Sequence, residues 1–133
     1  MNTQDLLKTI KDRRNTKSFT EEEVKKSDIE LILESGVWAP NHRNTEPWRF
    51  VVIDKSSELK KEISRSMISL QEESSNAKLT DDQKTNISLS VAKSPCYIFV
   101  FTTIGDTPEI TEENYGAVCC AIQNMQLTAT TLG

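Results

Sequence analysis

The sequence predicts an α+β fold that contains one buried central helix near its C-terminal end. Two short segments, 48–54 and 96–103, are rich in β-branched and aromatic residues, as strands are. Around and between them, apolar residues recur every three or four positions, which is the spacing of amphipathic helices. The segment 111–132 is rich in alanine and apolar around much of its circumference, so it predicts the buried central helix.

The composition of the 133-residue chain excludes several functional classes. A net charge of −4 argues against a nucleic-acid-binding surface. No apolar run approaches the roughly 18 residues that a membrane span needs, and the N-terminus lacks the pattern of a signal peptide. The cysteines are odd in number, which disfavours a disulfide framework and predicts a cytoplasmic location. We expect Cys96, Cys119 and Cys120 to be small core residues.

The N-terminal part predicts two helices. The first runs from about Thr3 to Arg14 and ends in a basic turn, where cations interact favourably with the helix dipole. The second begins at Ser27, because residues 27–30 read as a capping box with Glu30 at its third position. Pro40 ends this second helical pattern.

The middle of the chain predicts a strand, two helices and a second strand. The strand at 48–54 opens with Trp48, which we expect in the core. Helical spacing returns over 57–70, and the polar segment 71–78 predicts a mobile connection. A second capping box, 80–83, opens a helix that continues to Lys93. The segment 96–103 is almost wholly apolar, which predicts a strand buried on both faces.

Two polar segments, 13–17 and 39–48, carry side chains suited to a bound ligand. Arginine presents a planar fork of donors that matches phosphate oxygens, and asparagine both donates and accepts hydrogen bonds. His42 offers a donor for an anion or a ring for stacking. The set fits a phosphorylated ligand with a polar-edged aromatic group. The simpler alternative is that the arginines form a solvated helix end and that His42 lies on the surface.

These segments resemble the FMN-dependent nitroreductase family, and most closely its small members with a histidine in the second segment. The similarity runs from about residue 10 to the end of the chain and includes the central helix. The residues that carry the resemblance are Arg13-Arg14-Asn15, Lys17-Ser18-Phe19, Ala39-Pro40, Asn44-Thr45-Glu46-Pro47-Trp48-Arg49-Phe50, Asn124-Met125-Gln126-Leu127-Thr128-Ala129 and Leu132-Gly133. Asn15 stands where the family usually has serine, and Glu46 stands where it usually has glutamine.

The resemblance implies an α+β homodimer with a central antiparallel-type sheet flanked by helices and with FMN at the dimer interface. It implies hydride transfer from NAD(P)H through FMN to a nitroaromatic or quinone-like acceptor, with no catalytic acid or base. The sequence has one histidine, and the cysteines do not pair with it at ligand spacing, so we expect no metal site. The implied FMN contacts are Arg13, Arg14, Asn15 and Lys17 from one chain and His42, Asn44 and Glu46 from its partner.

We expect residues 1–133 to form a single domain that lacks the C-terminal part of the family. A second interpretation follows from that expectation. The chain would then be a non-catalytic relative of the family that binds flavin or forms dimers.

Overall fold

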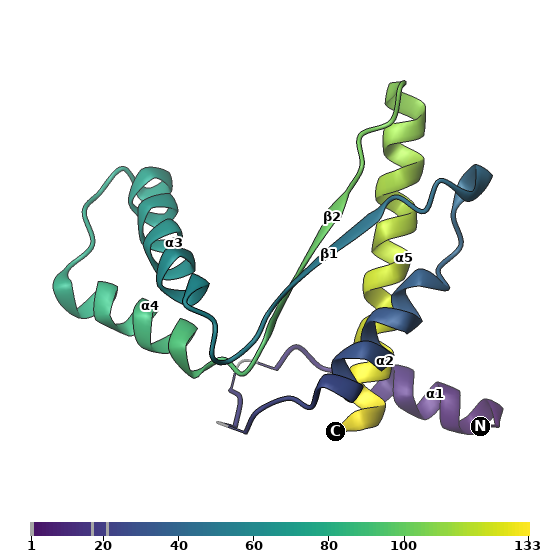
Figure 1. Cartoon of the computed structure of the whole chain (residues 1–133), viewed down its shortest axis with the longest axis horizontal. Helices are drawn as coiled ribbons and strands as arrows, with labels where there is room; N and C mark the ends of the chain where they lie inside the picture. The colour runs from purple at the N-terminus through teal and green to yellow at the C-terminus, as the bar shows by residue number, and fades with distance from the viewer. Residues whose placement is uncertain (1, 17, 21) are drawn as a thin grey trace. The chain divides into compact units, whose positions relative to one another are not determined.

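The computed structural model describes residues 2–16, 18–20 and 22–133, and it confirms the α+β fold class (Figure 1). In chain order the elements are α1 (Thr3–Asp12), α2 (Lys26–Val37), the 3₁₀ turn η1 (His42–Asn44), β1 (Trp48–Ile53), α3 (Leu59–Ser75), α4 (Asp81–Lys93), β2 (Tyr97–Thr102) and α5 (Pro108–Leu132). Within the described residues, none of the helices is both long and apolar enough to span a bilayer.

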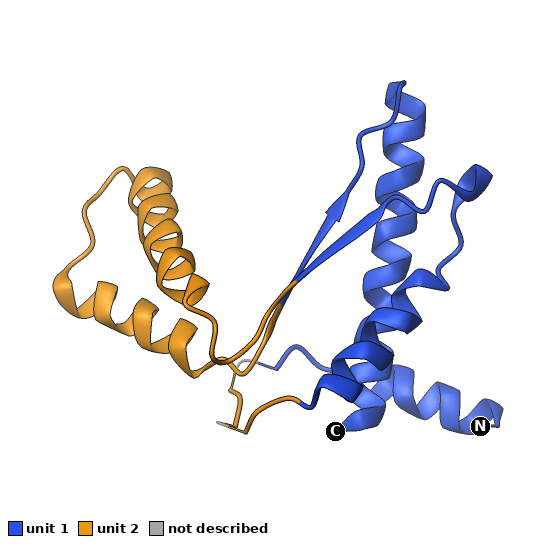
Figure 2. Ribbon diagram, viewed as in Figure 1, with its two compact units in different colours: residues 1–16, 25–51, 98–133 blue, residues 17–24, 52–97 orange. Residues whose placement is uncertain are grey.

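The chain divides into two compact units, which Figure 2 shows in different colours. Unit 1 comprises residues 1–16, 25–51 and 98–133, and unit 2 comprises residues 17–24 and 52–97. Unit 1 holds α1, α2, η1 and α5, whereas unit 2 holds α3 and α4. Strands β1 and β2 form a two-stranded antiparallel sheet.

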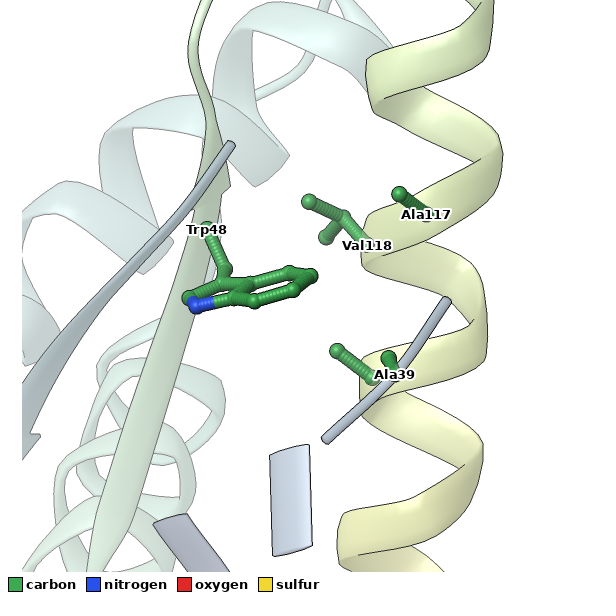
Figure 3. Packing of buried hydrophobic residues seen from close by; sticks show 5 residues of the cluster. Ala39, Trp48, Ala117 and Val118 are labelled. Atoms are coloured by element: carbon green, nitrogen blue, oxygen red, sulfur yellow. The ribbon is translucent and has the colours of Figure 1, made fainter. Parts of the chain in front are cut away.

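The core of unit 1 lies between the sheet and α5. Its buried cluster, drawn in Figure 3, consists of Ala39, Trp48, Ala117, Val118 and Ala121. Phe50, Val100 and Ile122 pack against this cluster. Trp48 is only 6% exposed, so its predicted place in the core is confirmed. The small residues of α5 leave room for the indole ring to lie against the helix. Aromatic side chains buried in this way dominate the packing energy of a core.

Helix α2 packs closely against α5 because position 36 has no side chain. A Cβ on Gly36 would lie 3.0 Å from Cγ of Met125 and 3.2 Å from Cζ of Phe50. One residue earlier on each helix, Asn124 donates from Nδ2 to the carbonyl oxygen of Ser35 at 3.2 Å. Packing and a side-chain hydrogen bond therefore hold the two helices together.

Two burial expectations for unit 1 are wrong. Cys119 and Cys120 are exposed, because the neighbours of α5 cover one stripe of the helix and these two positions lie outside it. In β2, which we expected to be buried on both faces, Phe101 is 53% exposed. Side chains alternate between the two faces of a strand, and the cluster beneath the sheet covers the face that carries Val100.

The first two helices begin or end at other residues than predicted. Helix α1 ends at Asp12, because the backbone of Arg13 leaves the helical region at φ −53° and ψ 128°. Helix α2 begins at Lys26, with Lys25 as an N-cap that makes no side-chain capping bond. The predicted Ser27 capping box is therefore wrong; the Ser27 hydroxyl lies inside the first turn, 3.4 Å from Oδ1 of Asp28.

Unit 2 contains the packed helices α3 and α4. The predicted connection at 71–78 is partly helical, because α3 continues to Ser75 and ends on a left-handed residue, Asn76, with φ 49°. The carboxylate of Glu72 accepts hydrogen bonds from Lys78, from the backbone N–H of Leu79 and from Lys84, each at 3.0 Å. The capping box that begins at Thr80 is confirmed.

Candidate functional site

The 41–47 loop of unit 1 has a conformation that most residues adopt only at an energetic cost. Three of its residues lie in the left-handed region, Arg43 at φ 56°, Asn44 at φ 54° and Glu46 at φ 43°. Asparagine tolerates this region, whereas arginine and glutamate do so at a cost on the order of 1 kcal/mol each. Such a loop needs contacts that hold it.

Hydrogen bonds inside the loop and at its end supply part of that hold. The backbone N–H of Glu46 donates to Oδ1 of Asn41 at 3.0 Å, and the N–H of Thr45 donates to the carbonyl oxygen of His42 at 3.3 Å. At the C-terminal end, Pro47 is fully buried, and its carbonyl oxygen accepts the N–H of Thr103 at 2.8 Å. The loop is therefore fastened where it enters the sheet.

A buried asparagine on α5 joins the tip of the loop to the helix. Asn114 is 4% exposed; its Oδ1 accepts the Thr45 hydroxyl at 3.1 Å, and its Nδ2 donates to the carbonyl oxygen of Thr103 at 3.1 Å. Sequence reasoning missed this residue. The signal that could have found it was its position, because 114 precedes Ala117 and Ala121 by three and seven residues and so falls on the buried stripe of the helix.

The three predicted site residues of the loop, His42, Asn44 and Glu46, are all exposed. Nδ1 of His42 lies 4.0 Å from Oε1 of Glu113, and the side chain of the histidine remains 53% exposed. The Glu46 carbonyl oxygen accepts the Arg49 guanidinium at 3.0 Å, but no ion pair of the described residues engages the Glu46 carboxylate. The loop thus presents an imidazole, an amide and a carboxylate to solvent.

The other predicted segment, 13–17, begins at the C-terminal end of α1. Arg13 is half-buried, and none of the described carboxylates forms an ion pair with it. Arg14 folds back and donates to the carbonyl oxygens of Lys11 and Arg13, so it caps the end of the helix. Asn15 is exposed, and Lys17 lies outside the described residues.

Charges next to this segment are already partly compensated. The ammonium of Lys8 holds the pKa of the Asp12 carboxyl below its usual range, and the charge of Arg14 contributes in the same direction. Asp12 is therefore engaged by its neighbours one helical turn back, while Arg13 keeps a guanidinium that no described acid neutralises. Within the described residues, the guanidinium of Arg13 therefore has donors left for a phosphate group.

Within one chain the two predicted segments lie at opposite ends of α5 (Figure 1). The loop contacts the first turns of α5 at Glu113 and Asn114, whereas α1 packs near the last turns. A helix rises 1.5 Å per residue, so Asn114 and Leu132 are about 27 Å apart along the axis. The structure therefore does not bring Arg13–Asn15 and His42–Glu46 together in a single copy.

Unit 2 contains a separate open cavity of about 590 Å³ between α3 and α4. Four cationic residues line it together with apolar ones, and no lining residue is acidic; the basic ones are Lys60, Lys61, Arg65 and Lys84. Three of these cations are paired with Glu58, Glu62 and Glu72, and the ammonium of Lys60 donates to the carbonyl oxygen of Ser94 at 2.5 Å. The cavity is not lined by any of the predicted site residues.

Comparison with known proteins gives a consistent result. Residues 10–133 match the family model described as "Nitroreductase family". The chain is 30% identical over 120 residues to the Bacillus subtilis (strain 168) protein named "Putative NAD(P)H nitroreductase YfhC", and the match covers 90% of this chain and 61% of that protein.

Two solved structures share the fold. A nitroreductase-like family protein from Bacillus cereus superposes with a TM-score of 0.78 at 26% identity, over 96% of this chain and 65% of the other. A nitroreductase with bound FMN from Bacteroides fragilis NCTC 9343 superposes with a TM-score of 0.67 at 27% identity, over 100% and 67%. The chain spans less than two thirds of the Bacillus subtilis relative and of the Bacillus cereus structure.

Proposed function

The chain belongs to the nitroreductase family, and on that premise we propose that it is an FMN-dependent oxidoreductase that works as a homodimer. It takes hydride from NAD(P)H and passes it to nitroaromatic or quinone-like acceptors. We place it in the cytoplasm, a location that its free thiols Cys96, Cys119 and Cys120 favour.

One observation carries the proposal: both polar segments and the central helix lie, in order, inside the residues that match the family. The FMN bound to the Bacteroides fragilis nitroreductase supports the choice of cofactor. The name of the Bacillus subtilis relative supports NAD(P)H as the hydride donor.

The residues present are chemically suited to hold FMN. The guanidinium of Arg13, which no described carboxylate pairs with, suits the phosphate. Arg14 and Lys17 follow it within four positions in the sequence, and we propose them as further contacts. The amide of Asn15 suits the ribityl hydroxyls. When bound, FMN supplies the hydride transfer itself, and the protein orients the groups and tunes their electrostatics.

The exposed loop residues would meet the ring system of the cofactor. Asn44 offers both a donor and an acceptor, and His42 offers a ring or a donor. Glu46 differs from the usual family glutamine, because an ionised carboxylate accepts hydrogen bonds but donates none. Its negative charge also disfavours a second negative charge beside it. A group bound next to Glu46 is therefore favoured in its neutral or cationic form.

The separation of the two segments along α5 supports a site shared between two copies. In a two-fold dimer each copy would supply Arg13–Asn15 to one site and His42–Glu46 to the other. Such an arrangement makes dimer formation a condition for tight FMN binding.

A non-catalytic relative of the family that binds flavin or forms dimers is the second candidate function. The two candidates differ in one measurable step. The oxidoreductase binds FMN and transfers hydride from NAD(P)H, whereas the non-catalytic relative binds flavin or forms dimers and transfers no hydride.

The test is a titration of the purified chain with FMN, followed by visible absorbance and flavin fluorescence. We expect saturable binding and bleaching of the flavin band when NADH or NADPH is added without oxygen. Saturable binding without bleaching would favour the non-catalytic relative. Absence of saturable binding would overturn the oxidoreductase and the flavin-binding relative alike.

A further inference from the structure

We infer that Asn114 is a positioning residue that holds the 41–47 loop in the conformation in which His42, Asn44 and Glu46 meet the flavin. This inference rests on the proposed function. It adds a residue that does not touch the ligand and that acts through Thr45.

The first step of the argument is the burial of Asn114. An amide placed among apolar side chains costs free energy unless its hydrogen bonds are satisfied. Asn114 is 4% exposed and lies on the same stripe of α5 as Ala117, Val118 and Ala121. An alanine or valine would fill this position without that cost, so the amide has to be explained by what it binds.

The second step is that the two bonds of Asn114 join segments that are distant in sequence. The amide oxygen accepts the Thr45 hydroxyl, 69 residues earlier, and the amide nitrogen donates to the carbonyl oxygen of Thr103. The same Thr103 donates its N–H to Pro47. Asn114 therefore ties the loop tip to the point where the loop enters the sheet.

The third step is the strain of the loop. Arg43, Asn44 and Glu46 are left-handed, and a loop with such residues persists only when surrounding contacts determine its conformation. Thr45 sits between Asn44 and Glu46, and its hydroxyl points inward to Asn114 while the side chains on either side of it are exposed. Loss of the Thr45–Asn114 bond would free the residues that face the ligand.

The experiment measures FMN affinity and thermal stability for two disruptive variants and two controls. Thr45→Val removes the hydroxyl at an exposed position with little change in shape, and Asn114→Ala removes the amide. Thr45→Ser keeps the hydroxyl. Asn124→Ala is the matched control, because Asn124 is also a partly buried α5 asparagine that donates to a backbone carbonyl, that of Ser35.

We expect Thr45→Val and Asn114→Ala each to weaken FMN binding about tenfold, the equivalent of one buried hydrogen bond. The double variant should bind FMN no more weakly than Asn114→Ala alone, because that change already breaks the bond to Thr45. Thr45→Ser should keep the original affinity. Asn124→Ala should lower the melting temperature and leave the FMN affinity unchanged, which separates positioning from stability.

Amide hydrogen exchange without FMN gives an independent readout. The N–H groups of Thr45 and Glu46 should exchange about tenfold faster in Thr45→Val and Asn114→Ala than in the original chain. Protection of residues in α2 and α5 should stay the same in Thr45→Val.

The inference and the proposed function fail in different ways. An original chain that does not bind FMN overturns the proposed function, and the role of Asn114 toward flavin falls with it. An original chain that binds FMN, with Thr45→Val and Asn114→Ala that bind equally well or act additively, overturns the inference alone. Unchanged exchange at 45 and 46 in both variants would also overturn it.

Discussion

Gly105 and Ile110 approach each other so closely that position 105 has no space for a side chain. A Cβ on Gly105 would lie 2.4 Å from Cγ2 of Ile110 and 2.9 Å from its backbone carbonyl carbon. The turn is also bonded, since the N–H of Gly105 donates to Oγ1 of Thr111 at 3.0 Å. This contact sets the turn from β2 into α5, the helix that carries Asn114.

Gly105→Ala should therefore destabilise the chain by about 1–3 kcal/mol, because the overlap includes backbone that cannot move aside. Urea denaturation monitored by circular dichroism measures the change. Gly116→Ala is the matched control, because a Cβ there meets nothing within 4 Å. That change should stabilise α5 by about 0.5–1 kcal/mol through helix propensity. Equal effects at both positions would contradict the packing argument.

Arg13→Ala should weaken FMN binding by about 1.5–3 kcal/mol, the value of charged hydrogen bonds to a phosphate. Fluorescence titration with FMN measures it. Lys11→Ala removes one positive charge from the same end of α1 and should change the affinity much less. If both variants bind FMN as tightly as the original chain, Arg13 is a surface charge.

Glu72 should make unit 2 sensitive to acid. Its pKa is lowered to about 2 by the hydrogen bond from Lys78, by the N–H of Leu79 and by Lys84. A carboxyl whose folded pKa lies below its ordinary value near 4.5 stabilises the fold above that ordinary value, and this contribution is lost as the pH falls toward 2. Glu72→Gln should therefore be less stable than the original chain at pH 7.

The difference in melting temperature between Glu72→Gln and the original chain should shrink as the pH is lowered from about 5 toward 2. Glu73→Gln serves as the control, because its carboxylate accepts the Ser69 hydroxyl on the exposed side of α3. A stability gap for Glu72→Gln that does not change with pH would show that the carboxylate charge is not the cause.

The three thiols should differ in reactivity toward a disulfide reagent such as DTNB. Cys119 and Cys120 are exposed and should be modified first. Burial raises the pKa of the Cys96 thiol, and the charge of Asp54 adds to this, so less of the reactive thiolate forms there. Replacing Cys119 and Cys120 with serine should remove the fast phase of reagent release, followed by its absorbance. A fast phase that survives would place the reactive thiol at Cys96.

Sequence patterns predicted an element correctly where the hydrogen bonds that the pattern requires form between residues close together in the chain. The capping box at Thr80 forms as predicted, because both its bonds join residues three positions apart. The same pattern at Ser27 fails, because α2 begins at Lys26 and the hydroxyl is already inside the helix. The capping pattern alone does not determine at which residue the helix begins.

Features that depend on distant contacts escaped prediction. Polar composition indicated a connection at 71–78, but α3 continues to Ser75, and the carboxylate of Glu72 pairs with Lys84, twelve residues further on. The loop residues were identified from their chemistry, whereas Asn114 was not, since its role depends on Thr45. Exposure of Cys119 depends on which side of α5 its neighbours cover, and periodicity in an alanine-rich helix does not determine that side.

The length of α5, which separates the two segments within one chain, predicts that two differently altered chains complement each other. If each flavin site combines Arg13 of one copy with the loop of the other, a chain altered at Arg13 and a chain altered at His42 are complementary. In a homodimer of either altered chain, both sites carry a substitution. A mixed dimer has both substitutions in one site, and its second site contains an unaltered Arg13 and an unaltered His42. Mixing the two inactive proteins would then restore about a quarter of the sites.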